Sequence, residues 1–266
     1  MGLLLKTGLN NELKNASFFS IFIICFILIL INIIPFFKNK IQSNTIKLGC
    51  CISNTAYYGL PIAIALLPEQ SLNSTIGFDL GSTMLTWCMG PIFISSWGRR
   101  SNNSLNSSLK KIFSSPGLKG FLGYLVVNLT PYKNFIGDLI WIPSKVILLI
   151  SLSVVGMYIS SLNIKLFKKE NLMLITKELS LPILIKLIIM PILTLLFSII
   201  FGFNFESTKA LVIQSAGPTA ISVLIINESQ RLESKLIGNL VITTTILSFM
   251  TVISFVYFLD FLYLKN

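Results

Sequence analysis

The stretch SNTAYYGLPIAIA, Ser53–Ala65, decides the fold. It lies in an apolar run, 47–67, that is long enough to cross a bilayer, yet it contains Ser, Asn, Thr, two Tyr and a Gly-Leu-Pro sequence. Pro61 has no backbone N–H and so leaves the carbonyl of Tyr57 without its helical partner, and Gly59 weakens the same turn. At membrane depth, freed backbone groups are tolerated only where they line a cavity or are buried in protein. The stretch therefore predicts a broken membrane helix beside an internal site.

The composition is that of an integral membrane protein. Of the 266 residues, 53% are hydrophobic and 12% are charged, whereas soluble domains carry about 25% charged residues. A spanning helix needs roughly 20 apolar residues, and the apolar runs lack the alternating pattern of a membrane barrel. We therefore predict an all-α membrane bundle of eight helices, over 17–37, 47–67, 76–97, 112–130, 139–160, 179–201, 208–226 and 236–259.

Lysines and arginines gather in alternate loops, which accounts for the net charge of +11. The loops 38–47, 98–119, 165–177 and 231–235 together hold 14 of these residues, whereas the loops and termini on the other side hold 5. Cytoplasmic loops carry the excess of Lys and Arg, so we predict that loop 98–119 is cytoplasmic and that residues 1–15 and the C-terminus are outside. The charge indicates a topology in a plasma membrane or bacterial inner membrane, and not a nucleic-acid partner.

A polar, basic connection divides the chain into two membrane halves. The segment 98–120 is rich in Ser and Asn, which is typical of a linker. We assign a first, N-terminally incomplete repeat of three helices to 1–97, a cytoplasmic linker to 98–111, and a second repeat of five helices to 112–266.

An internal repeat relates the two halves. An offset of 157 residues places Pro61 on Pro218, with six identities over 26 positions. An odd number of helices in each repeat inverts one half relative to the other, which is the architecture of many secondary transporters. We predict an inverted-repeat bundle with two broken crossover helices.

The second break predicts the other half of the site. Pro218 frees the carbonyl of Gln214, and Gly217 stands beside it. Two crossing broken helices direct two half-helix N-termini, each with about half a positive charge, at one point, which suits a small anion. The alternative is an ordinary proline kink whose carbonyls are satisfied by Ser and Thr. The candidate anion-binding residues are Ser53, Asn54, Thr55, Gly59, Pro61, Gln214, Ser215, Gly217, Pro218, Thr219 and Ser222.

Two charged residues lie within apolar runs. Lys186 is interpreted either as a countercharge to the substrate or a partner for a carboxylate, or as a lysine whose long stem reaches the cytoplasmic surface. Asp79 is interpreted either as a residue with a helix-start or interfacial role or as a proton-titrating carboxylate for coupling. The chain has no histidine, so proton coupling would use a carboxylate such as Asp79 or the substrate itself. The coupling ion stays open between a proton and sodium.

Four segments carry a resemblance to the auxin efflux carrier family, which includes plant PIN-type carriers and bacterial malonate or malate permeases. SNTAYYGLPIAIALLP (53–68) resembles the first crossover motif of that family, with Asn54, Gly59 and Pro61 at the matching positions and Ala56 in place of the usual glycine. The other three segments are LKKIFSSPGLKGFLGYLV (109–126), IKLIIMPIL (185–193) and SAGPTAISVLI (215–225), the last of which is similar to the second crossover.

The resemblance implies ten helices in two inverted repeats of five, with crossovers in the fourth and ninth helices and a cytoplasmic central loop. It also implies carboxylate substrates such as malonate, malate or an auxin-like acid. Only eight helices are predicted here, so we expect the first two family helices to be missing, through truncation or a misplaced start codon, with Met1–Asn10 as the tail of the second.

The function predicted from these features is a secondary transporter of a small organic anion that works by alternating access. An enzyme is not expected, because the sequence has no HExxH motif and no nucleophile elbow. No metal site or cofactor is indicated, and the small residues on the helices are too general to predict a homodimer. A channel, or a remnant of the same fold that inserts without transporting, is the alternative.

Overall fold

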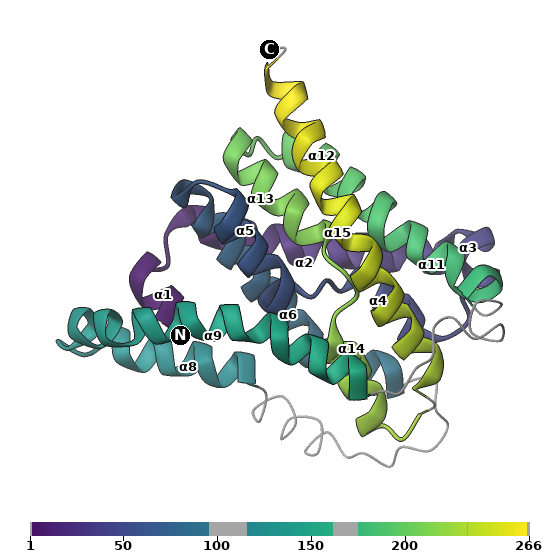
Figure 1. The fold of residues 1–266 in the computed structure, drawn as a ribbon, viewed down its shortest axis with the longest axis horizontal. Coiled ribbons are helices and arrows are strands. Elements are labelled where there is room, and N and C mark those ends of the chain that lie inside the picture. Colours follow the sequence, from purple (N-terminus) through teal and green to yellow (C-terminus); the bar gives the residue numbers. More distant parts are fainter. Residues whose placement is uncertain (1, 96–115, 162–174, 233, 265–266) are drawn as a thin grey trace.

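Helices make up all the named elements of the structure, a computed structural model that describes residues 2–95, 116–161, 175–232 and 234–264 (Figure 1). Within these ranges the only extended pairing is an isolated bridge between Ser53 and Thr219. The elements of the first half are α1 (Gly2–Thr7), α2 (Asn11–Ile33), α3 (Pro35–Lys40), α4 (Asn44–Cys51), η1 (Thr55–Gly59), α5 (Leu60–Leu66), η2 (Glu69–Ser71) and α6 (Leu72–Ser95). Those of the second half are α8 (Pro116–Asn128), α9 (Lys133–Ser161), η3 (Ile175–Leu179), α11 (Ser180–Leu184), η4 (Ile185–Ile189), α12 (Met190–Ile200), α13 (Phe205–Ala216), α14 (Ile221–Ser229) and α15 (Lys235–Leu264).

Three helices of the described chain are long and apolar enough to cross a membrane. They are Asn11–Ile33, Lys177–Ile200 and Lys235–Leu262, and they match three of the eight predicted runs. Their apolar side chains also point outward, since Phe18 is 72% exposed and Met250 is 75% exposed. Apolar residues on both faces of a helix suit a lipid environment, so the described fold is an all-α membrane fold.

Two glycines let α6 pack closely against α2. A Cβ atom added to Gly77 would lie 2.4 Å from the carbonyl oxygen of Leu13, and one added to Gly81 would lie 2.2 Å from that of Ser17. Ser17 also donates a hydrogen bond from its hydroxyl to the carbonyl of Gly77, at 2.9 Å. Glycines four residues apart allow close backbone approach between membrane helices, and here they fix α6 against α2.

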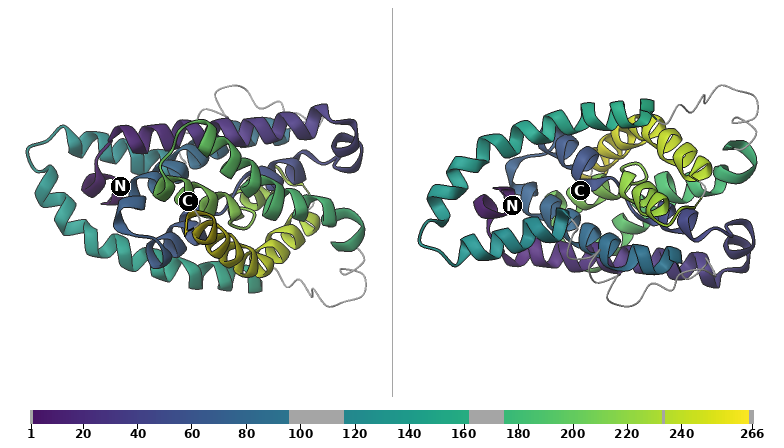
Figure 2. Two further views of the ribbon diagram at one scale, coloured as in Figure 1. Left: turned by 90° about the horizontal axis from the view of Figure 1, so that it is seen from above. Right: turned by 90° about the horizontal axis from the view of Figure 1, so that it is seen from below.

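The interrupted helices lie at the centre of the fold. All eight residues of α4 are buried, as are the ten residues of α13 from Ser207 to Ala216. Figure 2 shows α2 and α9 along opposite edges, with the interrupted helices between them. The breaks are therefore shielded by protein on most sides, which is the condition for tolerating non-helical backbone in a membrane.

The predicted runs 47–67 and 208–226 are each interrupted, but the first break differs in position from the prediction. Its non-helical residues are 52–54, whereas Pro61 lies within the helical stretch Thr55–Leu66, directly after the π-turn η1. The π-turn η1 leads into this helix, with the backbone N–H of Leu60 bonded to the carbonyl of Thr55.

The repeat register was wrong for the same reason. The second break, 217–220, contains Pro218, so an alignment of Pro61 with Pro218 does not superpose the two breaks. The inverted repeat remains a prediction. The predicted linker, 98–111, lies outside the described residues, so the proposed domain boundaries and the side of its loop also remain predictions.

Candidate functional site at the helix crossing

The two breaks pair with each other. The backbone N–H of Asn54 donates to the carbonyl of Pro218 at 2.8 Å, and the N–H of Ala220 donates to the carbonyl of Ile52 at 3.0 Å. These two bonds form a short antiparallel pairing around Ser53 and Thr219. Each break thus satisfies backbone groups that the other break frees, so neither leaves these groups orphaned in the interior.

Side chains strengthen the crossing. The hydroxyl of Thr219 donates to the carbonyl of Gly49 at 3.0 Å, and the backbone N–H of Thr219 donates to the hydroxyl of Thr244 at 3.1 Å. The hydroxyl of Ser53 donates to the carbonyl of Ser215 at 3.1 Å. Residues from both interrupted helices and from α15 therefore hold the crossing in one geometry.

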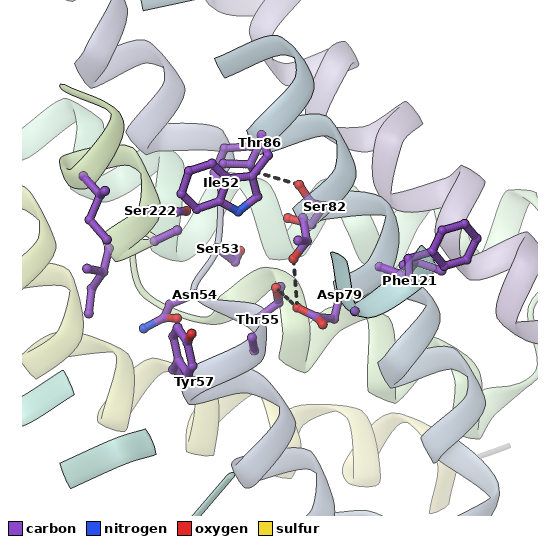
Figure 3. A pocket seen from close by; sticks show the side chains of 18 of the residues that line it. Ile52, Ser53, Asn54, Thr55, Tyr57, Asp79, Ser82, Thr86, Phe121 and Ser222 are labelled. Atoms are coloured by element: carbon purple, nitrogen blue, oxygen red, sulfur yellow. Dashed lines mark hydrogen bonds between the residues drawn. The ribbon is translucent and has the colours of Figure 1, made fainter. Parts of the chain in front are cut away.

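A cavity of about 540 Å³ opens beside the crossing (Figure 3). This volume falls within the range of about 300–1,000 Å³ that is usual for small-molecule sites. Its wall comes from the first break and the start of η1, from one face of α6, from the start of α14, and from α1 and α8. Its lining residues are Leu4, Ile52, Ser53, Asn54, Thr55, Ala56, Tyr57, Asp79, Leu80, Ser82, Thr83, Thr86, Trp87, Gly120, Phe121, Ala220, Ile221, Ser222 and Ile225.

Two helix N-termini border this cavity. The first residues of η1 and of α14 both line it, and the residues that precede them, Asn54 and Ala220, make no side-chain capping bond. The first-turn N–H groups of a helix have no intrahelical partners and carry a partial positive charge. Two N-termini without side-chain caps therefore give the cavity a positive character that comes from the backbone.

Asp79 is the acidic residue of the cavity wall. Its carboxylate accepts hydrogen bonds from the hydroxyl of Thr55 at 2.6 Å and from that of Thr83 at 3.4 Å. Because α6 begins at Leu72, Asp79 lies two turns inside the helix and the helix-start interpretation was wrong. The bond to Thr55 links α6 directly to the start of η1, next to the crossing.

Lys186 lies behind the crossing and does not line the cavity. Its side chain has 0% exposure, which excludes the interpretation that its stem reaches the surface. The Nζ atom donates to the hydroxyl of Ser53 at 2.7 Å and to the carbonyl of Ser215 at 2.8 Å. Any anion in the cavity would be separated from this ammonium by the Ser53 hydroxyl.

The other predicted site residues fall into two groups. Ser53, Asn54, Thr55 and Ser222 line the cavity with Asp79. The second group belongs to the crossing and its packing and is absent from the cavity wall: Gly59, Pro61, Gln214, Ser215, Gly217, Pro218 and Thr219. Gly59 provides room for a neighbour, because a Cβ atom there would lie 2.1 Å from Oε1 of Gln214.

The sequence reasoning overlooked the polar face of α6. Ser82, Thr83 and Thr86 line the cavity along with Asp79. They follow Asp79 by three, four and seven residues, which is the spacing of one helix face. That pattern was visible in the sequence. The structure also separates the adjacent tyrosines: Tyr58 is buried against Phe249, whereas Tyr57 lines the cavity.

Comparison with known proteins gives one relative. Over 201 residues the chain is 25% identical to an uncharacterized transporter of Methanocaldococcus jannaschii, a match that covers 76% of this chain and 63% of that protein. The chain thus spans less than two thirds of the relative's length. No family model matches the chain, and no solved structure matches it. The transporter relative and the three apolar helices together support a membrane transport protein.

Proposed function

We propose that the chain is a secondary transporter of a small organic anion, and that the anion binds in the cavity beside the helix crossing. The observation that carries the proposal is the pair of helix N-termini, those of η1 and α14, that border one cavity without side-chain caps. Each N-terminus stabilises a carboxylate by roughly 0.3–2 kcal/mol. Two of them give modest affinity, which suits a carrier that must release its cargo.

Side chains on opposite walls add hydrogen-bonding groups. Asn54 and Ser222 line the cavity, and neither side chain has a hydrogen-bond partner among the described residues. Ser53 differs, because its hydroxyl hydrogen is directed at the carbonyl of Ser215. We therefore assign direct contact with the anion to Asn54, Ser222 and the first-turn N–H groups, and a supporting role to Ser53.

A carboxylate is the anion we propose, with malonate, malate or an auxin-like acid as examples. The resemblance to the auxin efflux carrier family supports this class, as does the cavity chemistry of amide, hydroxyl and backbone N–H donors, with no cation among the described residues that line it. Donors of this kind bind a carboxylate and release it more readily than a direct ion pair would.

A proton is the coupling ion we propose, with Asp79 as its carrier. Two negative charges roughly 6 Å apart repel each other by about 3 kcal/mol at an effective dielectric constant of 20. Asp79 lines the same cavity that would hold the anion, so an anion binds well only when Asp79 is protonated. Substrate and proton would then move together.

Alternating access would change the cavity without breaking the crossing. The paired breaks and their side-chain bonds form a fixed centre, while α6 and α8 supply the opposite wall. In transporters with broken helices, one bundle rocks against another around such a centre. Through the hydrogen bond from Thr55 to Asp79, an anion bound in the cavity would affect the position of α6.

Ligand-dependent thermal unfolding of the purified protein tests the binding part of the proposal. Malonate or malate at ten times its Kd should stabilise the protein by about 1.4 kcal/mol, whereas the neutral analogue malonamide should have no effect. Asn54→Ala should weaken the response, and Asn134→Ala, on the exposed surface of α9, should preserve it. If neither acid stabilises the protein more than malonamide does, the carboxylate proposal fails.

A further inference from the structure

Lys186 has a buried amino group without a counter-anion among the described residues. It lies in η4, its side chain has 0% exposure, and it forms no ion pair with any described residue. Three donor contacts hold its ammonium group: the hydroxyl of Ser53 at 2.7 Å, the carbonyl of Ser215 at 2.8 Å and the sulfur of Met190 at 3.3 Å. A buried charge is costly unless it is paired or fully hydrogen-bonded, so this arrangement needs an explanation.

The carbonyl of Ser215 is available to a cation because of the break. This residue lies in the last turn of α13, and an uninterrupted helix would pair its carbonyl with the N–H of Thr219. That N–H donates instead to the hydroxyl of Thr244. The freed carbonyl also lies at the negative end of the helix dipole, where positive charge is stabilised. A cation is therefore favoured at this position.

The second oxygen comes from the other break. Ser53 accepts a hydrogen bond from Lys186 with its hydroxyl oxygen, while its hydroxyl hydrogen is directed at the same carbonyl of Ser215. A hydroxyl oxygen and a freed carbonyl at the end of a half-helix are the kind of ligands that bind sodium in transporters with broken helices. The ammonium group thus sits in an oxygen environment suited to a monovalent cation.

We propose that Lys186 is a tethered cation that fills the ion position of the crossing, so that the protein needs no sodium there. The position of the cation is inferred from the contacts of Lys186 alone. Only its consequence, uptake that does not depend on sodium, rests on the proposed transport function. The ionisable groups that act on Lys186 from α4 are the buried thiols of Cys50 and Cys51, and no carboxylate of the described chain pairs with it.

Shortening the side chain of Lys186 should leave a binding site for a free cation at the position of its ammonium group. Lys186→Ala removes the ammonium and leaves room, so the crossing should become dependent on an added small cation. Lys186→Met fills a similar volume without charge, so it should be destabilised and should gain no response to cations. Lys209→Ala is a second control, because Lys209 pairs with Asp260, which is 42% exposed and stays solvated when its partner is removed.

The first readout is the thermal unfolding temperature, which requires no substrate. At constant ionic strength the wild type should unfold at the same temperature in sodium, ethylammonium and choline. Lys186→Ala should unfold at a lower temperature in choline and should be stabilised saturably by sodium or ethylammonium, whereas Lys186→Met and Lys209→Ala should show no such dependence. Saturable stabilisation of the wild type by sodium over choline would overturn the proposal, as would a Lys186→Met variant as stable as the wild type.

The second readout is carboxylate uptake into liposomes. Wild-type uptake should be unchanged when choline replaces sodium. Lys186→Ala should lower uptake by about tenfold or more, as expected for loss of charge-assisted hydrogen bonds, and ethylammonium should restore part of it. If wild-type protein binds and carries no carboxylate, the proposed function fails, while the unfolding measurements still decide the cation position. If Lys186→Ala does not fold, the sodium response of the wild type and the Lys186→Met variant decide it.

Discussion

The backbone N–H of Asn54 donates to the carbonyl of Pro218 across 164 residues of sequence, at 2.8 Å. This bond and its partner between Ala220 and Ile52 make the two helix breaks a single unit. It follows that residues that set the backbone of the breaks matter for a different reason from residues that line the cavity. The two kinds of residue can be separated by experiment.

Asn54→Ala should weaken carboxylate transport. The variant removes a side-chain amide from the cavity wall but keeps the backbone bond to Pro218, so the fold should be preserved. Loss of one hydrogen bond to a charged ligand costs about 1.5–3 kcal/mol, which predicts a KM at least about tenfold higher. Uptake kinetics measured beside the Asn134→Ala control check this. An unchanged KM would place the anion elsewhere.

Pro218→Ala should be far more damaging than Pro61→Ala. Pro218 prevents α13 from continuing through the break, and alanine would allow helix to replace the extended pairing. Pro61 lies within the helical stretch Thr55–Leu66, directly after the π-turn η1, and alanine there would keep this stretch helical. Uptake normalised to folded protein should therefore fall strongly for Pro218→Ala and by less than about twofold for Pro61→Ala. A larger loss of uptake for Pro61→Ala than for Pro218→Ala would indicate that Pro61, and not residues 52–54, determines the first break.

Asp79→Asn should remove the dependence of uptake on pH. In the wild type, raising the external pH deprotonates Asp79, the carboxylate repels the anion, and uptake falls. Asparagine is neutral at every pH, so uptake by the variant should change only as the substrate itself titrates. Wild type and variant are therefore compared at each pH, with the exposed Glu228→Gln as a control that keeps the wild-type slope. If the variant keeps that slope, a group other than Asp79 carries the proton.

Gly81→Ala should lower stability through helix packing. The added Cβ would lie 2.2 Å from the carbonyl oxygen of Ser17, so α6 would have to move away from α2. Overpacking of this kind costs about 1–3 kcal/mol. Gly156→Ala, which has no neighbour within 4 Å, is the matched control and should be neutral or stabilising. Thermal unfolding of both variants tests the contact; equal unfolding temperatures would contradict it.

The sequence predicted the interrupted runs because proline removes a helical hydrogen bond and glycine weakens the helical turn. It misplaced the first break because residues 52–54 contain neither; their conformation is set by pairing with residues 217–220, a contact distant in sequence. Pro61 was taken as the break itself, whereas it lies just after the π-turn η1 inside the helix that follows the break.

Some residues of the candidate site could likewise be predicted from the sequence, whereas others depend on contacts between distant parts of the chain. Asn54, Thr55 and Ser222 were predictable from polar residues beside the breaks, and the polar face of α6 could have been found from its helical spacing. The position of Lys186 could not, because its contacts with Ser53 and Ser215 depend on how three helices meet. Charge within an apolar run indicates an internal partner but does not identify it.

Uptake of radiolabelled malonate and malate into liposomes that contain the purified protein tests the central claim most directly. The account predicts saturable uptake, driven by an inward proton gradient, that Asn54→Ala weakens and Pro218→Ala abolishes. Uptake that rises linearly with substrate would indicate a channel. No uptake and no binding by properly inserted, folded protein would contradict the claim that the cavity beside the crossing carries a carboxylate.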